Sequence, residues 1–254
     1  MKDLFSLAGR TALITGGSRG IGRMIAAGFL AQGARVYISS RKAAACEQTA
    51  LELSATGPCV ALPADVSTLA GVQGLAAALA ARESALDILV NNAGAAWAAA
   101  FDEFPESGWD KVIDLNLKAP FFLTQALHDM LRRAAVHRPA KVINIASIDG
   151  VSVNPQETYS YAASKAGLIH LTRRMALRLA RDNIVVSAIA PGAFASDMNR
   201  DARDHGDEVA RHIPIGRIGR DEDMAGAAIY LASRAGDYVV GETLVVDGGV
   251  THSR

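Results

Sequence analysis

The chain has 254 residues, of which 50% are hydrophobic, and its 26 basic and 26 acidic side chains cancel. This size and composition suit one large α/β domain. A net charge of zero argues against a dedicated nucleic-acid-binding protein, which would carry a basic surplus. No apolar run reaches the ~18 residues that a membrane span needs, and the N-terminus lacks a signal-peptide core, so we expect a cytoplasmic protein.

Short β-branched or apolar runs alternate with long alanine-rich stretches along the chain. This alternation predicts a seven-stranded parallel sheet covered by helices on both faces, the doubly wound Rossmann arrangement, in one domain over residues 1–254. The expected strands are 11–15, 35–39, 59–62, 86–91, 141–146, 184–190 and 243–246, and the expected helices are 21–32, 69–82, 109–133, 161–181 and 223–233.

The first strand is followed by TGGSRGIG, residues 15–22, which opens the first helix. Gly16, Gly20 and Gly22 permit a tight turn and let backbone N–H groups approach a pyrophosphate. The N-terminus of the following helix adds partial positive charge for the anion. In this strand–loop–helix context the glycines predict a dinucleotide-binding loop.

The second strand ends in VYISSRK. Dinucleotide-binding folds commonly place an acid there to hold the ribose 2′-OH. Here Ser40 takes that position and Arg41 follows, a pair that favours a 2′-phosphate. Arg19 in the glycine loop can close over the same phosphate, so the sequence favours NADP over NAD. The alternative is that both arginines are solvated surface charges.

Polar residues stand at the ends of two central strands and inside one long apolar helix. LDILVNNAG ends the fourth strand with Asn91, Asn92 and Gly94, and KVINIAS ends the fifth with Ser147. Asn116 lies among apolar neighbours, so its side chain needs a hydrogen-bond partner inside the protein.

The segment YSYAASK, residues 159–165, offers two tyrosines beside one lysine. Tyr161 is four residues before Lys165 and therefore shares its helix face. Tyr159 is six residues before Lys165, about 120° away around the helix. An ammonium close to a phenol favours the phenolate, so we expect Lys165 to lower the pKa of Tyr161. Tyr161 is thus the predicted reagent, and Tyr159 a wall or packing residue.

Residues 196–220 break the alternation, being polar and charged between a strand and a helix. A long insertion at this point predicts a mobile substrate lid.

These motifs, in this order, resemble the short-chain dehydrogenase/reductase family over essentially the whole chain. The likeness is to 3-oxoacyl-(acyl carrier protein) reductases, and most closely to the β-ketoacyl reductase linked with rhamnolipid synthesis. The family likeness rests on the glycine loop, NNAG at 91–94, Asn116, Ser147, Tyr161 with Lys165, Pro191-Gly192 and VDGG at 246–249. The likeness to the rhamnolipid-linked reductase rests on FSLAGRTALITGGSRGIG, LDILVNNAGAAW, VINIASIDG and IPIGRIGR.

The resemblance implies roles for the catalytic set. Tyr161 is the acid/base, Lys165 lowers its pKa and holds the nicotinamide ribose, Ser147 polarises the carbonyl, and Asn116 anchors a water in a proton relay. It also implies that Asn91 lies beside the adenosine ribose. The implied cofactor-binding residues are Gly16, Ser18, Arg19, Gly20, Ile21, Gly22, Ser40, Arg41, Asp65, Val66, Asn92, Ala93, Gly94, Tyr161, Lys165, Pro191, Gly192, Phe194 and Ser196.

The expected reaction is NADPH-dependent reduction of a ketone, with a 3-oxoacyl thioester of an acyl carrier protein or of CoA as substrate. The alternatives are an NADP-dependent sugar, polyol or general secondary-alcohol dehydrogenase and, from another class, a cofactor-binding regulator without turnover. Asp149, two residues after Ser147, is the one hint of a hydroxylated substrate, unless it points to solvent. Ser147 and Tyr161 are 14 positions apart, about one more than is common in the family, so the loop between them is where we expect an irregularity.

An acyl carrier protein is acidic and would need a basic patch. The candidates for this patch are Arg132, Arg133, Arg173, Arg174 and Arg178. The simpler alternative is that they are ordinary arginines on exposed helix faces.

The family implies a homotetramer or dimer paired through the helices of Asn116 and Tyr161. Neither the six histidines nor Cys46 and Cys59 show metal-ligand spacing, so no metal is expected.

Overall fold

The computed structural model describes residues 3–253 and contains one parallel sheet in the order β3-β2-β1-β4-β5-β6-β7. Every neighbouring pair of strands is parallel, so the predicted doubly wound sheet is confirmed. The strands are β1 Thr11–Thr15, β2 Arg35–Ser39, β3 Cys59–Ala61, β4 Ile88–Asn91, β5 Ala140–Ile145, β6 Ile184–Pro191 and β7 Thr243–Val246.

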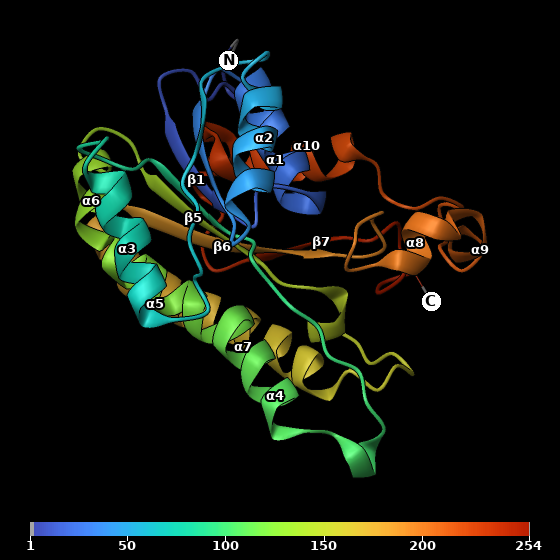
Figure 1. The fold of residues 1–254 in the computed structure, drawn as a ribbon. Helices are drawn as coiled ribbons and strands as arrows, with labels where there is room; N and C mark the ends of the chain where they lie inside the picture. Colours follow the sequence, from blue (N-terminus) through green and yellow to red (C-terminus); the bar gives the residue numbers. More distant parts are fainter. Residues whose placement is uncertain (1–2, 254) are drawn as a thin grey trace.

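Helices cover both faces of this sheet (Figure 1). Helices α1, α2 and α10 lie on one face, and α3, α5 and α7 lie on the other. The helices are α1 Gly20–Ala31, α2 Ala43–Leu53, α3 Leu69–Ala80, α4 Glu106–Ile113, α5 Ala119–Ala126, α6 His128–Ala134, α7 Tyr159–Leu179, α8 Arg200–Asp204, α9 Gly206–Ala210 and α10 Asp221–Ala232.

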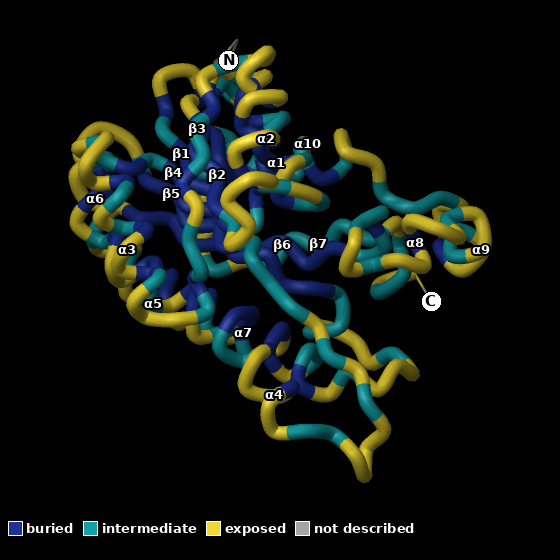
Figure 2. The backbone as a smooth tube through the Cα atoms, viewed as in Figure 1, coloured by how far each residue is buried: buried dark blue, intermediate teal, exposed yellow. Residues whose placement is uncertain are grey.

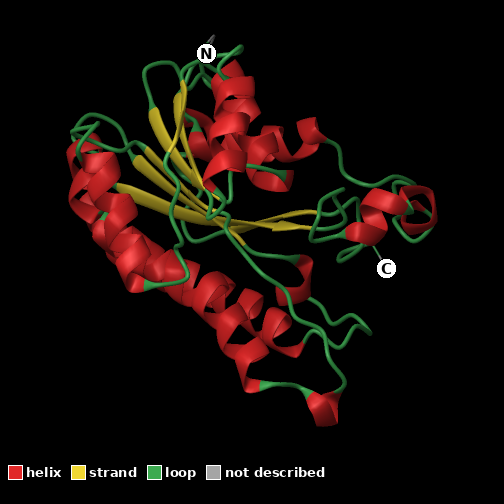
Figure 3. Ribbon diagram, viewed as in Figure 1, coloured by secondary structure: helices red, strands yellow, loops and turns green. Residues whose placement is uncertain are grey.

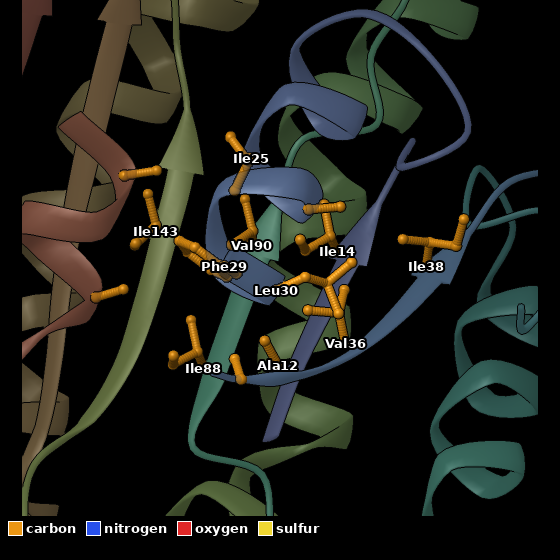
Figure 4. Packing of buried hydrophobic residues seen from close by; sticks show 14 of the residues in the cluster. Ala12, Ile14, Ile25, Phe29, Leu30, Val36, Ile38, Ile88, Val90 and Ile143 are labelled. Atoms are coloured by element: carbon orange, nitrogen blue, oxygen red, sulfur yellow. The ribbon is translucent and has the colours of Figure 1, made fainter. Parts of the chain in front are cut away.

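Alternate residues of each strand feed two separate cores, because successive side chains of a strand point to opposite faces. Ile14 of β1 joins the core beneath α1 and α10, whereas its neighbour Leu13 joins the core beneath α3, α5 and α7. Figure 4 shows the first core, where Phe29 and Leu30 of α1 pack over the strands. Burial on both faces explains why the strands read as nearly continuous apolar runs.

The predicted long helix over 109–133 is interrupted in the structure. After α4 the chain widens into a π-helical segment, η2, at Asp114–Lys118, and then continues as α5 and α6. Pro120 lies in the first turn of α5, where its missing N–H costs the fewest bonds. Single π turns inside helices are frequent at functional sites, and this one carries Asn116.

Helix α2 is an addition to the predicted elements. Its buried residues Cys46, Thr49, Ala50 and Leu53 follow the i, i+3, i+4, i+7 spacing of an amphipathic helix. The alanine-rich start of the helix conceals this pattern, because alanine does not mark a buried face.

Residues 196–220 project from the carboxyl end of β6 with α8 and α9, beyond the end of the sheet (Figure 3). They are held to the body by a bridge between Phe194 and Gly219 and by the Arg217–Asp223 ion pair. Figure 2 shows this segment as largely exposed or half-buried, in contrast to the buried strands.

Candidate active site

The predicted site residues gather at one edge of the sheet. The glycine loop follows β1, Asn92 to Gly94 follow β4, Ser147 follows β5, and Gly192 follows β6. The strands are parallel, so their carboxyl ends meet at the same edge, where open α/β sheets bind ligands.

Tyr161 and Lys165 lie in the first turns of α7 and face each other. The Lys165 Nζ atom is 5.6 Å from the centre of the Tyr161 ring and donates a hydrogen bond of 2.7 Å to the carbonyl of Ile145. The Ser147 hydroxyl lies close enough to the Tyr161 phenol to lower its pKa. These three residues therefore form one contact group that joins the end of β5 to α7.

Tyr159 has different surroundings. Its ring makes edge contacts with Phe101 and Phe104, at centroid distances of 5.6 and 5.7 Å, and its hydroxyl donates to Glu157. It belongs to an aromatic wall beside the site, which supports the choice of Tyr161 as the reagent.

The pKa of Tyr161 differs from the sequence-based expectation. Burial, opposed by the nearby Ser147 hydroxyl and aided by the Asp149 carboxylate, raises this pKa to about 12. Burial likewise lowers the pKa of Lys165 to about 8. Lys165 therefore does not offset the desolvation of the phenol in the protein alone, and the tyrosine is held protonated, as a proton donor must be.

Asn116 has the partners that its apolar surroundings demanded. Its side-chain oxygen accepts from the N–H of Ala95 at 2.8 Å, and its amide donates to the Ala95 carbonyl at 2.9 Å and to the Ser164 hydroxyl at 3.0 Å. The π turn lets this side chain reach across from η2 to the chain that follows β4. Asn116 thus joins that chain to α7, one residue before Lys165.

The glycine loop forms a cradle that side chains would fill. Gly16 and Gly20 have positive φ, and a Cβ placed on Gly22 would lie 2.3 Å from the Gly16 carbonyl oxygen. Asn92 holds the loop by donating to the carbonyls of Thr15 and Gly16 at 2.9 and 3.2 Å. No side chain caps the first turn of α1, so its N–H groups face the loop free for an anion. A dinucleotide pyrophosphate fits this arrangement.

Arg19 and Arg41, expected at a 2′-phosphate, are both more than half exposed and already paired with acids. Arg41 lies 3.9 Å from Asp65, and Arg19 forms an ion pair with Asp197. The hydroxyl of Ser40 makes only a 3.4 Å contact to the carbonyl of Lys42. Exposed side chains of this kind can exchange a carboxylate for a phosphate.

The implied place of Asn91 beside the adenosine ribose does not match its side chain, which is buried in the protein. It donates to Thr124 at 3.3 Å and to Asn144 at 2.9 Å, and Asn144 donates on to Thr172 at 2.9 Å. Asn91 is the last strand residue before Asn92, and successive side chains of a strand alternate between the two faces. The two side chains therefore serve different parts of the protein. Asn91 links β4 to the layer of α5 and α7, whereas Asn92 holds the glycine loop.

Three other implied cofactor contacts are also largely enclosed by protein. Val66 is buried in the core with α3, and Phe194 is buried against Gly219. Ser196 accepts a 3.1 Å bond from the N–H of Asn199. Asn144, by contrast, was missed. Its signal in the sequence is a polar residue in the middle of VINIAS, which can be buried only with a partner.

Residues 3–253 hold no cluster of His, Cys, Asp and Glu suited to a metal ion. In the same range, no helix is both long and apolar enough to span a bilayer.

Known proteins match this chain over nearly its whole length. The family model described as enoyl-(acyl carrier protein) reductase matches residues 16–251. The rhamnolipids biosynthesis 3-oxoacyl-(acyl-carrier-protein) reductase of Pseudomonas aeruginosa is 49% identical over 98% of this chain and 99% of its own. The 5-keto-D-gluconate 5-reductase of Escherichia coli is 37% identical over 98% of both.

Solved structures match equally widely. The Pseudomonas aeruginosa RhlG/NADP active-site complex has a TM-score of 0.95 and 49% identity, covering 99% of this chain and 100% of the other. A gluconate 5-dehydrogenase from Burkholderia cenocepacia in complex with NADP and tartrate has a TM-score of 0.89 and 36% identity, covering 98% of both.

Proposed function

Because the chain belongs to the short-chain dehydrogenase/reductase family of oxidoreductases, we propose that it reduces the ketone of 3-oxoacyl thioesters with NADPH. The observation that carries the proposal is the contact group of Ser147, Tyr161 and Lys165, joined to Asn116 at the carboxyl edge of the sheet. The thioester substrate is taken from the 49% identical reductase of rhamnolipid synthesis.

In this mechanism each residue acts on the substrate oxygen or on the proton it receives. The Ser147 hydroxyl donates a hydrogen bond to the ketone oxygen, and the Tyr161 phenol transfers its proton to that oxygen as negative charge develops. Lys165 stabilises the phenolate that Tyr161 leaves behind. NADPH supplies the hydride when bound, and the glycine loop with the first turn of α1 holds its pyrophosphate.

NADP is preferred to NAD because no acid stands at Ser40, where it would repel a 2′-phosphate. Arg41 and Arg19 are the phosphate ligands in this proposal, each exchanging its present carboxylate partner for the phosphate. The solved neighbours named above hold NADP, which supports the same choice.

The test is NADPH oxidation by the purified protein with acetoacetyl-CoA and longer 3-oxoacyl thioesters, with NADH in parallel. We expect turnover that is faster with NADPH. Absence of turnover at every chain length would reject the thioester proposal. Intact NADPH binding without activity on a broad panel of carbonyl compounds would return the non-catalytic regulator.

A sugar-acid or polyol dehydrogenase is the second candidate. It is favoured by the names of several relatives at 35–37% identity that act on gluconates. Oxidation of gluconate with NADP at a rate above that of thioester reduction would establish it instead.

We also propose that the protein assembles through α5 and α7 into dimers and tetramers, and that residues 196–220 act as a mobile lid. Phe121 and Leu177 of these helices are exposed apolar side chains, as an interface would require. A monomer in light scattering at micromolar concentration would count against the assembly.

An acyl carrier partner gains little from the arginines at the ends of α6 and α7. Arg178 and Arg132 share Asp182 with His128. Arg178 also follows Tyr161 by 17 residues, which is ~26 Å along the helix. Arg173 is nearer, at ~18 Å, so it is the more suitable contact for a carrier whose arm reaches the site.

A further inference from the structure

Asp149 is fixed beside the catalytic group by its main chain. It lies in η3, Ile148–Gly150, and its N–H donates to the Ser147 hydroxyl at 3.1 Å. The same turn packs on α7 so closely that a Cβ on Gly150 would lie 2.6 Å from the carbonyl carbon of Lys165. The position of Asp149 is therefore set by the two elements that carry Ser147, Tyr161 and Lys165.

The Asp149 carboxylate is half-buried, and within residues 3–253 it has no hydrogen bond or ion pair. Other acids near this end of the sheet are satisfied. Asp223 pairs with Arg217, Asp197 pairs with Arg19 and Arg203, and Asp247 accepts from Thr251. A half-buried carboxylate that keeps part of its water but has no partner among the described residues is free to act on a bound molecule, so its place at the active centre suggests a role there.

The charge of Asp149 reaches both catalytic side chains, since it raises the pKa of Tyr161 and that of Lys165. The elements packed against η3 are α7 and β6, and β6 carries no ionisable side chain. Among the ionisable side chains of α7, Tyr161 and Lys165 are those whose pKa the Asp149 carboxylate raises, so the field near the reacting oxygen is shaped by Asp149 and Lys165 together.

We propose that Asp149 is a specificity-determining residue that excludes ketones carrying an anionic group one methylene away from the carbonyl. The inference rests on the proposed reduction of 3-oxoacyl thioesters. In a free 3-oxo acid, one methylene group separates the carboxylate from the ketone carbon, whereas an ester or thioester is uncharged at that position. Ser147 and Tyr161 fix the ketone oxygen, so such a carboxylate would be held in the field of Asp149 and repelled. The enzyme thus accepts esterified 3-oxo acids and rejects free ones.

The experiment compares acetoacetate with methyl acetoacetate, two ketones that differ in this charge. The measured quantity is the ratio of kcat/KM for acetoacetate to kcat/KM for the methyl ester, with NADPH at physiological ionic strength. We expect a low ratio for the wild type. In Asp149→Asn the ratio should rise at least ~10-fold, equal to about 1.4 kcal/mol of selectivity. Asp149→Glu, which keeps the charge, should stay near the wild-type ratio.

Glu157→Gln is the matched control, because it removes an exposed acid, eight positions along the same loop, whose carboxylate accepts a hydrogen bond from Tyr159. It should leave the ratio unchanged, since exposed charges are screened by salt. Asp149→Asn should also shift the alkaline limb of the ketone-reduction profile to lower pH, because Lys165 then loses the group that favours its charged form. A merely structural role for Asp149 would move neither the ratio nor this limb.

The outcomes separate this inference from the proposed function. If the wild type reduces neither ketone nor any thioester, the reductase proposal fails. If it reduces the methyl ester and Asp149→Asn leaves the ratio as it was, the role of Asp149 is overturned. Asp149→Ser is a second variant should the asparagine form not fold. A wild type that reduces both ketones equally well would overturn the inference without any variant.

Discussion

The catalytic wall, made of β5, η3 and α7, and the 196–220 segment stand on the same edge of the sheet but are held by different forces. The wall is tied to β4 and α5 by buried neutral hydrogen bonds, in a ladder from Thr124 through Asn91 and Asn144 to Thr172. In the 196–220 segment, exposed ion pairs dominate, with Arg203 bound to both Asp197 and Asp204. The wall therefore fixes reacting groups, whereas the segment can rearrange at low cost, because exposed pairs are weak and buried networks are not.

The largest expected effect tests the wall at its reactive point. Tyr161→Phe removes the proton donor while keeping the ring, so we expect ketone reduction to fall by roughly 10²- to 10⁴-fold. NADPH oxidation and NADPH binding, followed by fluorescence titration, would separate chemistry from cofactor affinity. Tyr159→Phe is the control and should keep activity, since the Tyr159 ring packs on Phe101 and Phe104 and its hydroxyl donates to Glu157. The reverse pattern would exchange the roles of the two tyrosines.

The second prediction compares the two regions by stability. Asn144 is fully buried, and Asn144→Ala leaves Asn91 and Thr172 short of a partner. We expect a loss of about 2 to 3 kcal/mol in the free energy of unfolding, measured by urea denaturation. Arg203→Ala removes an exposed side chain from the 196–220 segment and should leave the unfolding midpoint within error. Equal losses in the two variants would contradict the contrast between buried bonds and exposed pairs.

The third prediction uses pH to probe the buried lysine. Burial lowers the pKa of Lys165 to about 8, so the ammonium is present below that pH and lost above it. Ketone reduction needs this cation and a protonated Tyr161, whose pKa is raised to about 12. The rate of NADPH-dependent reduction should therefore fall as pH rises through about 8. A rate that stays level up to pH 10 would mean that the pKa of Lys165 in the working protein lies well above about 8.

The sequence predicted the sheet, and it predicted that the proposed catalytic residues lie close together, because both follow from local patterns. Apolar runs alternate with helices, and the residues at strand ends meet at one edge whatever the packing. It did not predict which of the two asparagines, Asn91 or Asn92, faces the glycine loop, since this depends on the register of β4. Nor did it predict the π turn at Asn116, because the sequence around it reads as ordinary helix and the turn is stabilised by contacts to Ala95, 21 positions away.

The expectation that Lys165 lowers the pKa of Tyr161 was wrong for a related reason. Spacing along the helix places Lys165 on the correct face but says nothing of burial. In the structure, desolvation of both groups outweighs their attraction, and Asp149 adds to the effect on the phenol. Electrostatic expectations from sequence therefore fail where the sign depends on a buried environment.

The smallest expected effect belongs to the contact between the two sides of the cofactor cradle. Arg19 of the glycine loop pairs with Asp197, directly after Ser196, and a Cβ on Gly20 would lie 3.2 Å from that of Ser196. A 2′-phosphate must compete with Asp197 for Arg19. Asp197→Ala should therefore tighten NADPH binding by about two- to fivefold and leave NADH binding nearly unchanged, because exposed pairs contribute little. The gain should shrink at high salt. Weaker NADPH binding in this variant would mean that the pair supports the cradle instead of competing with the cofactor.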